Sequence, residues 1–280
     1  MSHEEIERSV SDHYGWSGLK ETIEAEIRRH GIDPQRVTVA QLAPVDNYHW
    51  LRLAGTLALA DAAAITGTER VLDVGGGIGG PARQLASRSG CHVTVLDVTP
   101  EYCVVGETLT GWTGLTERVK FVHGSALEMP FRDGSFDVVW TQHATMNIPD
   151  KPRLYGEIAR VVRSGGRFAM FDVLAGPRQP IHFPVPWASD ESFSFLLPPE
   201  ETRAMITGTG FRELTWMTDL DKAMEAALAK PDPLGEPDPS SDGLNPGLLN
   251  GPDGPRMGAN VQRNMEEDRI RFAMGVFERL

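Results

Sequence analysis

A glycine-rich turn between two apolar stretches constrains the fold of this chain more than any other feature. The stretch reads V-L-D-V-G-G-G-I-G-G-P-A-R from Val71 onward, with five glycines in six positions. Such a run makes a poor helix and a poor strand, because glycine loses more backbone entropy on ordering than any other residue. Gly75, Gly77 and Gly80 have the G-x-G-x-x-G spacing, and Pro81 suits a first helical turn. The pattern predicts a strand, a tight turn and a helix, with a ligand held against bare backbone.

The chain beyond residue 70 alternates short apolar runs with helical segments, which is typical of a parallel sheet with crossover helices. Asp97 ends the second run, 22 positions after Gly75, where a carboxylate can accept hydrogen bonds from ribose hydroxyls. We therefore expect an α/β, Rossmann-like seven-stranded sheet with helices on both faces and an adenosine-containing cofactor. The predicted strands cover residues 70–74, 92–98, 119–124, 136–142, 166–174, 211–218 and 269–277.

The chain before the sheet is predicted to form a helical cap. Amphipathic or alanine-rich patterns predict helices over residues 16–30 and 52–65. This divides the chain into an N-terminal helical cap, residues 1–66, and a cofactor-binding domain, residues 67–280. Two proline-rich loop insertions are expected in that domain, at 175–197 and 231–258, the second of them a lid or a passive loop. A further helix before the fifth strand is expected to end at Gly165.

Composition limits the partners of the chain. The formal net charge is −12, without the clustered Lys and Arg that nucleic-acid binding needs, so we expect a small-molecule partner and no nucleic acid. No apolar run is long enough to span a bilayer and no signal peptide is visible, so we expect a cytoplasmic protein with no membrane contact. The two cysteines have no metal-ligand spacing, and no metal is expected. A homo-oligomer is compatible with the N-terminal helix.

Asp73 selects among adenosine-containing cofactors. This carboxylate stands two residues before Gly75, where it would repel a pyrophosphate and attract a cation. S-adenosyl-L-methionine carries a sulfonium and an ammonium, whereas a dinucleotide carries two phosphates. The sequence favours the sulfonium cofactor, whose product is S-adenosyl-L-homocysteine.

Residues 70–174 resemble the class I S-adenosylmethionine-dependent methyltransferases. The similarity is greatest to small-molecule enzymes of the sarcosine/dimethylglycine type and to their relatives in natural-product biosynthesis. The motifs that carry it are V-L-D-V-G-G-G-I-G-G-P-A-R, V-L-D-V-T-P-E, H-G-S-A-L-E-M-P-F, S-F-D-V-V-W-T-Q-H-A-T-M-N-I-P-D-K and R-V-V-R-S-G-G-R-F-A-M-F-D-V-L.

The resemblance implies a set of cofactor-binding residues. Asp73, Gly75 and Gly77 would line the methionine end, and Asp97 would hold the ribose. Val98 would lie against the adenine, and the Ala126 backbone would read its ring. The family usually has an acidic residue at the position of Ser125, which commonly accepts from the adenine amino group. A serine hydroxyl can accept there more weakly.

The end of the fourth predicted strand should lie near the transferred methyl group, because ligands of open α/β sheets bind beyond the carboxyl ends of the strands. His143 is the leading candidate for a base or a substrate contact, and Thr141 and Gln142 should touch the amino-acid end of the cofactor. Tyr14 and His49 are further candidates from the cap, Tyr14 because an aromatic ring can face a sulfonium.

The sequence therefore predicts an enzyme, a methyltransferase that acts on a nitrogen, oxygen or carbon atom of a small molecule. The aromatic side chains of two loops suggest an apolar wall for the acceptor, whereas the family resemblance suggests a small amine. An NAD(P)-dependent oxidoreductase and a non-catalytic S-adenosylmethionine-binding protein remain as alternatives. The four loop aromatics are Phe183, Trp187, Phe193 and Phe195.

Overall fold

The computed structural model describes residues 2–15, 17–47, 49–218 and 253–280. Within these residues, seven strands form one sheet in the order β3-β2-β1-β4-β5-β7-β6. The first five strands in the chain are parallel, and β7 is antiparallel to both β5 and β6. This confirms the predicted fold class. The strands are β1 (Arg70–Val74), β2 (His92–Asp97), β3 (Val119–His123), β4 (Phe136–Gln142), β5 (Val162–Ala175), β6 (Phe211–Met217) and β7 (Ile270–Arg279).

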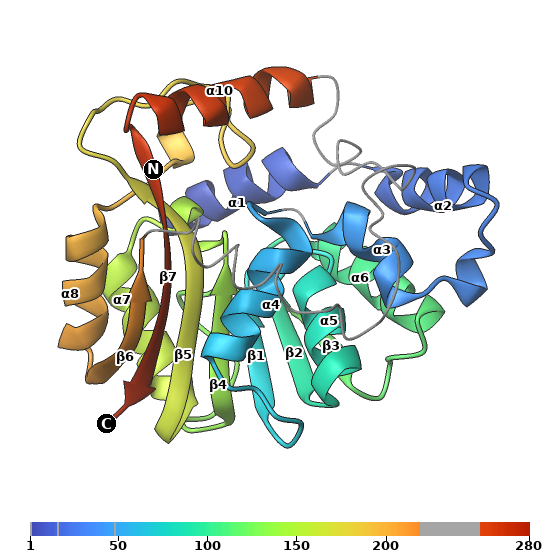
Figure 1. Ribbon diagram of the computed structural model, residues 1–280, viewed down its shortest axis with the longest axis horizontal. Helices are drawn as coiled ribbons and strands as arrows, with labels where there is room; N and C mark the ends of the chain where they lie inside the picture. The colour runs from blue at the N-terminus through green and yellow to red at the C-terminus, as the bar shows by residue number, and fades with distance from the viewer. Residues whose placement is uncertain (1, 16, 48, 219–252) are drawn as a thin grey trace.

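Helices cover both faces of the sheet (Figure 1). Helices α4 and α5 pack on one face, and α7 and α8 pack on the other. Helices α1 and α10 lie across the end of the sheet where the parallel strands finish. The helices are α1 (His3–Tyr14), α2 (Leu19–Arg29), α3 (Val39–Asp46), α4 (Arg52–Ala62), α5 (Gly80–Ser89), α6 (Pro100–Trp112), α7 (Lys151–Val161), α8 (Pro199–Gly208) and α10 (Gly254–Glu266), with short 3-10 turns η1 (Pro34–Arg36), η2 (Thr145–Asn147) and η3 (Glu191–Phe193).

The central strands are buried on both faces, as the continuous apolar runs predict. In β4, Val138 and Trp140 point into the cluster formed with α4 and α5, while Val139 points into the cluster formed with α7. This alternation of side chains is the two-residue period of a strand. The strand is therefore held from both sides, which fixes the position of the residues at its carboxyl end.

Two N-terminal helices, α1 and α3, were not expected from the apolar pattern. Each begins with a capping box, in which an N-cap hydroxyl and the side chain three residues later satisfy the first free backbone N–H groups. The pairs are Ser2 with Glu5 and Thr38 with Gln41. These S/T-x-x-E/Q signals are present in the sequence and could have located both helices.

The boundary between α7 and β5 differs from the prediction. The helix ends at Val161, and β5 begins at once with Val162, which pairs with Phe136 before the register shifts. Gly165 has a positive φ of 70° and lies within this irregular start of the strand. The positive φ of Gly165 therefore belongs to the irregular start of β5, and the prediction that this glycine ends the helix is wrong.

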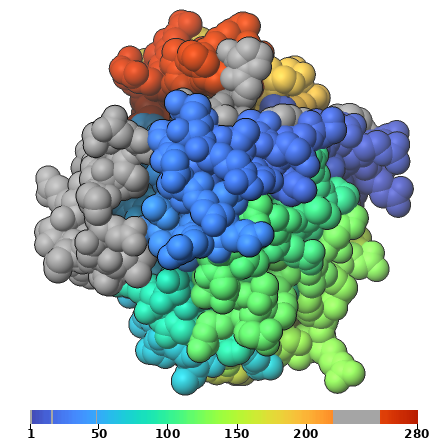
Figure 2. All heavy atoms as spheres, turned by 90° about the vertical axis from the view of Figure 1, so that its right-hand side faces the viewer, coloured from blue at the N-terminus to red at the C-terminus, as the bar shows by residue number. Residues whose placement is uncertain are grey.

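The C-terminal end of the predicted loop insertion at 231–258 is also helical. Residues 231–252 lie outside the described part of the chain, but Gly254 to Gly258 form the first turns of α10. In Figure 2 the N-terminal residues, in blue, lie between the green central part of the chain and the red α10. The cap predicted for residues 1–66 contains α1 to α4, and Ile6 and Val10 of α1 belong to the same hydrophobic cluster as Val261 of α10.

Candidate active site

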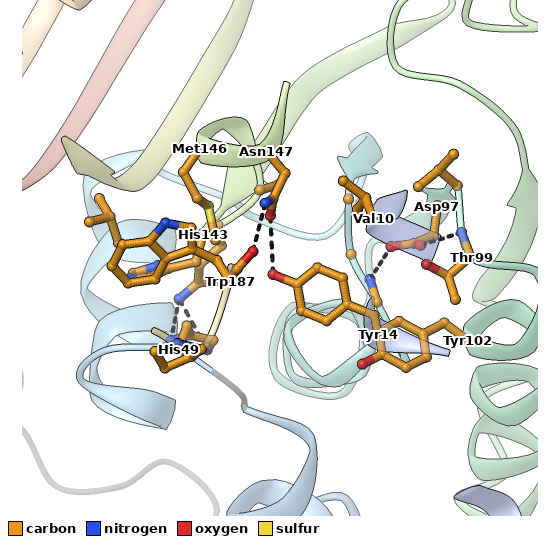
Figure 3. A pocket seen from close by; sticks show the side chains of 18 of the residues that line it. Val10, Tyr14, His49, Asp97, Thr99, Tyr102, His143, Met146, Asn147 and Trp187 are labelled. Atoms are coloured by element: carbon orange, nitrogen blue, oxygen red, sulfur yellow. Dashed lines mark hydrogen bonds between the residues drawn. The ribbon is translucent and has the colours of Figure 1, made fainter. Parts of the chain in front are cut away.

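A cavity of about 1020 Å³ opens at the carboxyl ends of the parallel strands. Its walls include residues that follow β1, β2 and β4, together with residues of α1, α3 and α10. Figure 3 shows Tyr14 of α1, Thr99 after β2 and His143 after β4 among them. In this sheet β2 and β3 lie on one side of β1, and β4 and β5 lie on the other. The cavity is at the point where the strand order reverses, which is where ligands of open α/β sheets bind. The volume is at the upper end of the range for one drug-sized ligand, so the cavity has room for a cofactor and an acceptor.

The glycine turn positions a carboxylate beside this cavity. Gly77 has a φ of 57°, and its N–H donates to Oδ2 of Asp97 at 2.8 Å. The Thr99 N–H donates to the other oxygen of Asp97, also at 2.8 Å. The carboxylate is thereby held at the cavity wall, where it can still accept from ligand hydroxyls.

Several glycines of the turn are in close contact with other parts of the protein. A Cβ on Gly80 would overlap with the backbone carbonyl of Asp46 in α3, and a Cβ on Gly79 would overlap with the ring of Phe121. Only Gly75, Gly76 and Gly77 of the run line the cavity. Even there, a Cβ would come to 2.5 Å from protein atoms at two positions, Cβ of Ala144 for Gly75 and Oδ2 of Asp73 for Gly76. Close contacts within the protein therefore account for several of these glycines.

Asp73 is a buried carboxyl group with an orphaned oxygen. The residue is 1% exposed, and its Oδ2 has no hydrogen-bond partner among the described residues. Burial and the nearby Asp97 raise the pKa of Asp73 to about 8. A buried carboxylate without a partner is unfavourable, and a cation beside it would compensate. The site therefore fits a ligand with a positive charge at this position.

Of the three residues predicted to lie near the adenine, one does not line the cavity. Val98 and Ala126 line the cavity, but Ser125 does not. The Ser125 hydroxyl is turned toward α1, where it donates to Oε1 of Glu7, and Glu7 itself lines the cavity. Sequence reasoning missed Glu7, which is 118 residues away in the chain.

The site residues predicted at the end of β4 do not all reach the cavity. Gln142 and His143 line the cavity, whereas Thr141 is fully buried beneath the wall. Neighbouring side chains of a strand point to opposite faces, so adjacent residues cannot both face one cavity from within the strand. His143 follows the strand with a φ of 52°, a left-handed conformation that is strained for this residue.

His49 and His143 lie side by side with ring centroids 5.8 Å apart. Nε2 of His143 accepts from the Trp50 N–H at 3.3 Å. Nδ1 of His49 lies 3.1 Å from the Trp50 carbonyl oxygen, and its ring contacts the Gln142 amide at 3.0 and 3.1 Å. Burial lowers the pKa of His49 to about 4 and lowers the pKa of His143 well below its usual value. Both rings are therefore neutral near pH 7. The two nitrogens of His49 and Nε2 of His143 are engaged, whereas Nδ1 of His143 is buried with no hydrogen-bond partner among the described residues.

Tyr14 of α1 reaches the middle of the cavity. Its hydroxyl donates to Oδ1 of Asn147 at 3.1 Å, and Asn147 in turn donates to the backbone carbonyls of Trp187 and Phe193 (Figure 3). This chain of hydrogen bonds ties α1, η2 and the 175–197 segment together over the site. The Tyr14 ring lies 6.0 Å from the ring of Tyr102, which also lines the cavity.

The far part of the cavity has an aromatic wall. Trp50 stacks on Phe272 with ring centroids 5.2 Å apart, and Trp187 also lines the cavity. Of the four loop aromatics predicted to form this wall, only Trp187 does so among the described residues, because Phe183, Phe193 and Phe195 pack into the core. Trp50 and Phe272 were missed, and nothing in their local sequence distinguishes them from core aromatics.

Three further properties concern the described residues alone. No group of three or more His, Cys, Asp and Glu side chains among them could hold a metal ion. No helix among them is long and apolar enough to cross a bilayer. Cys91 and Cys103 are buried free thiols.

Comparison with known proteins identifies the central part of the chain. Residues 72–170 match the family model of the methyltransferase domain. This chain contains a methyltransferase domain. The domain covers β1 to β5, and thus the strands whose carboxyl ends carry Asp73, Asp97 and His143.

The methyltransferase domain is similar to enzymes with different acceptors. A sterol 24-C-methyltransferase of Gibberella zeae is 40% identical over 105 residues, which are 38% of this chain and 28% of that protein. A sarcosine/dimethylglycine N-methyltransferase of Halorhodospira halochloris is 31% identical over 146 residues, 52% of each chain. The matched segments thus span between about a quarter and a half of these relatives.

The fold of the whole chain also has solved counterparts. A geranyl diphosphate C-methyltransferase from Streptomyces coelicolor, determined with Mg²⁺, geranyl-S-thiolodiphosphate and S-adenosyl-L-homocysteine, superposes with a TM-score of 0.66 at 16% identity and covers 98% of each chain. A putative sarcosine dimethylglycine methyltransferase from Galdieria sulphuraria has a TM-score of 0.60 at 23% identity, covering 80% of this chain and 84% of that one. At these identities the likeness concerns the fold.

Proposed function

We propose that the protein transfers a methyl group from S-adenosyl-L-methionine to an uncharged, largely apolar small molecule. The observation that carries the proposal is the orphaned, buried oxygen of Asp73 beside a turn that also fixes Asp97. When bound, the cofactor supplies a methyl group already activated on a sulfonium.

The residues fit the cofactor in chemical terms. The Asp73 carboxylate would face a cationic group, and Asp97 would accept from the ribose hydroxyls while the glycine turn holds it in place. Val98 and Ala126 would flank the base. The bare backbone at Gly75 and Gly77 lets the ligand approach closely.

The acceptor is proposed from the charges and rings of the remaining wall. Among the described lining residues, Arg52 is the one Lys or Arg side chain, and the rings of His49 and His143 are neutral near pH 7, which leaves too little positive charge for a diphosphate. The aromatic wall of Trp50, Trp187 and Phe272 instead fits an apolar body.

The acceptor atom is proposed to need no strong base. A base works best when its pKa is near the working pH, and the pKa of His49 is about 4. The rings of His49 and His143 and the Tyr14 hydroxyl would instead orient the acceptor and exclude water, since alignment alone contributes several kcal/mol to methyl transfer. This role favours a carbon or nitrogen atom with accessible electrons over a hydroxyl.

Calorimetry with S-adenosylhomocysteine tests the cofactor assignment. We expect wild-type protein to bind, and Asp73→Asn and Asp97→Ala to weaken binding by about tenfold or more, because each loses a charged hydrogen-bond partner. Asp133→Asn, at an exposed ion pair with Arg160, is the matched control. No uptake by the wild type, or equal uptake by all three variants, would refute the assignment.

Acceptor class is tested on the protein loaded with S-adenosylhomocysteine. Geraniol, geranyl diphosphate and sarcosine serve as probes of an apolar neutral, an anionic and a small amine acceptor. We expect geraniol to bind and the other two not to bind. Methyl-labelled cofactor with apolar acceptors then separates a catalyst from a protein that only binds the cofactor.

A further inference from the structure

Four carboxyl-bearing side chains line the cavity among the described residues, and three of them have a clear task. Asp46 is paired with Arg83, Asp97 is held by the glycine turn, and Asp73 lies buried beside that turn. The fourth is Glu7, on the cavity side of α1, between the buried residues Ile6 and Val10 of the same helix. Its carboxylate contacts the hydroxyl of Ser125, the chain neighbour of Ala126, which also lines the cavity.

Ser125 fixes the position of the Glu7 carboxylate. The Ser125 hydroxyl donates to Oε1 of Glu7 and accepts from the Leu127 N–H at 3.0 Å. The one proton of this hydroxyl is therefore committed to Glu7, and the hydroxyl is ill placed to serve a ligand. Oε2 of Glu7, by contrast, has no hydrogen-bond partner among the described residues and can accept from one.

We propose that Glu7 of α1 accepts the hydrogen bond from the 6-amino group of the cofactor's adenine, with Ser125 as its positioning residue. The inference rests on the proposed cofactor and deepens it. The acidic side chain that the family resemblance leads one to expect at position 125 is absent, and a carboxylate from another element is bonded to the residue that replaces it. The specificity for adenine is thereby moved from the sheet to α1.

The assignment has a consequence for the cap. Helix α1 also carries Tyr14, whose hydroxyl contacts Asn147 in the middle of the site. A base bound to Glu7 would hold α1 against the sheet and so would fix Tyr14 over the acceptor space. Cofactor binding and the ordering of the acceptor site are coupled through one helix.

Binding of two nucleosides to variants of the full chain tests the proposal. The probes are S-adenosylhomocysteine and S-inosylhomocysteine, which carries a 6-oxo group instead of the 6-amino group. We expect the wild type to prefer the adenine compound, and Glu7→Gln to lose about tenfold or more in its affinity for that compound, because a charged hydrogen bond is lost. The preference should also shift toward the inosine compound, because a glutamine amide can donate to the oxo group. Glu4→Gln, at an exposed position of the same helix, is the control.

A carboxylate restored on the sheet distinguishes recognition from folding of α1. We expect Glu7→Ala to lose affinity for the adenine compound and Glu7→Ala/Ser125→Asp to regain most of it. If the wild type binds neither nucleoside, the cofactor assignment itself fails. If the wild type binds the adenine compound but Glu7→Gln keeps both the affinity and the preference, the cofactor assignment stands and the role of Glu7 is refuted.

Discussion

The buried Asp73 carboxyl is unfavourable in the free protein, and the same group favours the binding of a cation. Burial and Asp97 raise its pKa to about 8, so the group is mostly protonated in the free protein at neutral pH. A ligand ammonium or sulfonium favours the ionised form. Binding and proton release are therefore linked at this one residue.

The linkage predicts how cofactor affinity depends on pH. Below pH 8, binding must remove a proton from Asp73, so the affinity for S-adenosylhomocysteine should fall as the pH decreases, by up to about tenfold per unit. Calorimetry at pH 6.5 in two buffers with different ionisation enthalpies should detect the release of a proton. At pH 8.5, where Asp73 is mostly ionised, the difference between the heats in the two buffers should be much smaller. Equal heats at pH 6.5 would mean that Asp73 carries no proton to release.

Helix α10 shapes the acceptor side of the cavity through residues with little or no side chain. Gly254, Pro255, Gly258 and Val261 line the cavity, and this spacing places them on one face of the helix. A Cβ on Gly258 would meet nothing within 4 Å. Because Gly258 lines the cavity, we expect a larger side chain there to take room from an acceptor.

Gly258→Leu is therefore expected to reduce acceptor binding without reducing cofactor binding. We expect the affinity for geraniol, measured on the loaded protein, to fall by about tenfold or more, because the new side chain occupies acceptor space. The affinity for S-adenosylhomocysteine should stay within about twofold. Gly156→Leu in α7 makes the same change at another helical position with open surroundings, away from the cavity, and should change neither. An unchanged affinity for geraniol in Gly258→Leu would place the acceptor elsewhere.

The elements show what local sequence can and cannot predict. The strand runs were located well, because a doubly buried strand needs a continuous apolar run. The two-residue period would also have separated Thr141 from Gln142, since only one of two neighbours can face the cavity from the strand. The pairing of Glu7 with Ser125 was beyond prediction, because it depends on how α1 crosses the end of the sheet. No local pattern encodes that crossing.

At the scale of the whole molecule, the cap and the sheet are joined by shared buried groups. Ile6 and Val10 of α1 belong to the same hydrophobic cluster as β-strand residues such as Trp140. Nη2 of Arg83 in α5 lies 2.8 Å from Oδ2 of Asp46 in α3, and both side chains are fully buried. The division into a cap and a domain, predicted from the sequence, therefore need not separate two folding units.

We expect the cap and the sheet to unfold together, with the Arg83–Asp46 pair as a junction between them. Arg83→Met should lower the free energy of unfolding by about 3–5 kcal/mol, because Asp46 is left buried without its partner. Arg83→Met/Asp46→Leu should recover most of this loss, since an apolar pair carries no buried charge. Arg88→Met, on the same helix at a half-buried ion pair with Asp61, should lower the free energy of unfolding by about 1 kcal/mol or less.

Urea unfolding followed by tryptophan fluorescence and by circular dichroism should give coincident transitions in every variant. Two separate transitions in the wild type would show that the cap folds on its own, and a double variant no more stable than Arg83→Met would show that packing, rather than the paired charge, makes the junction.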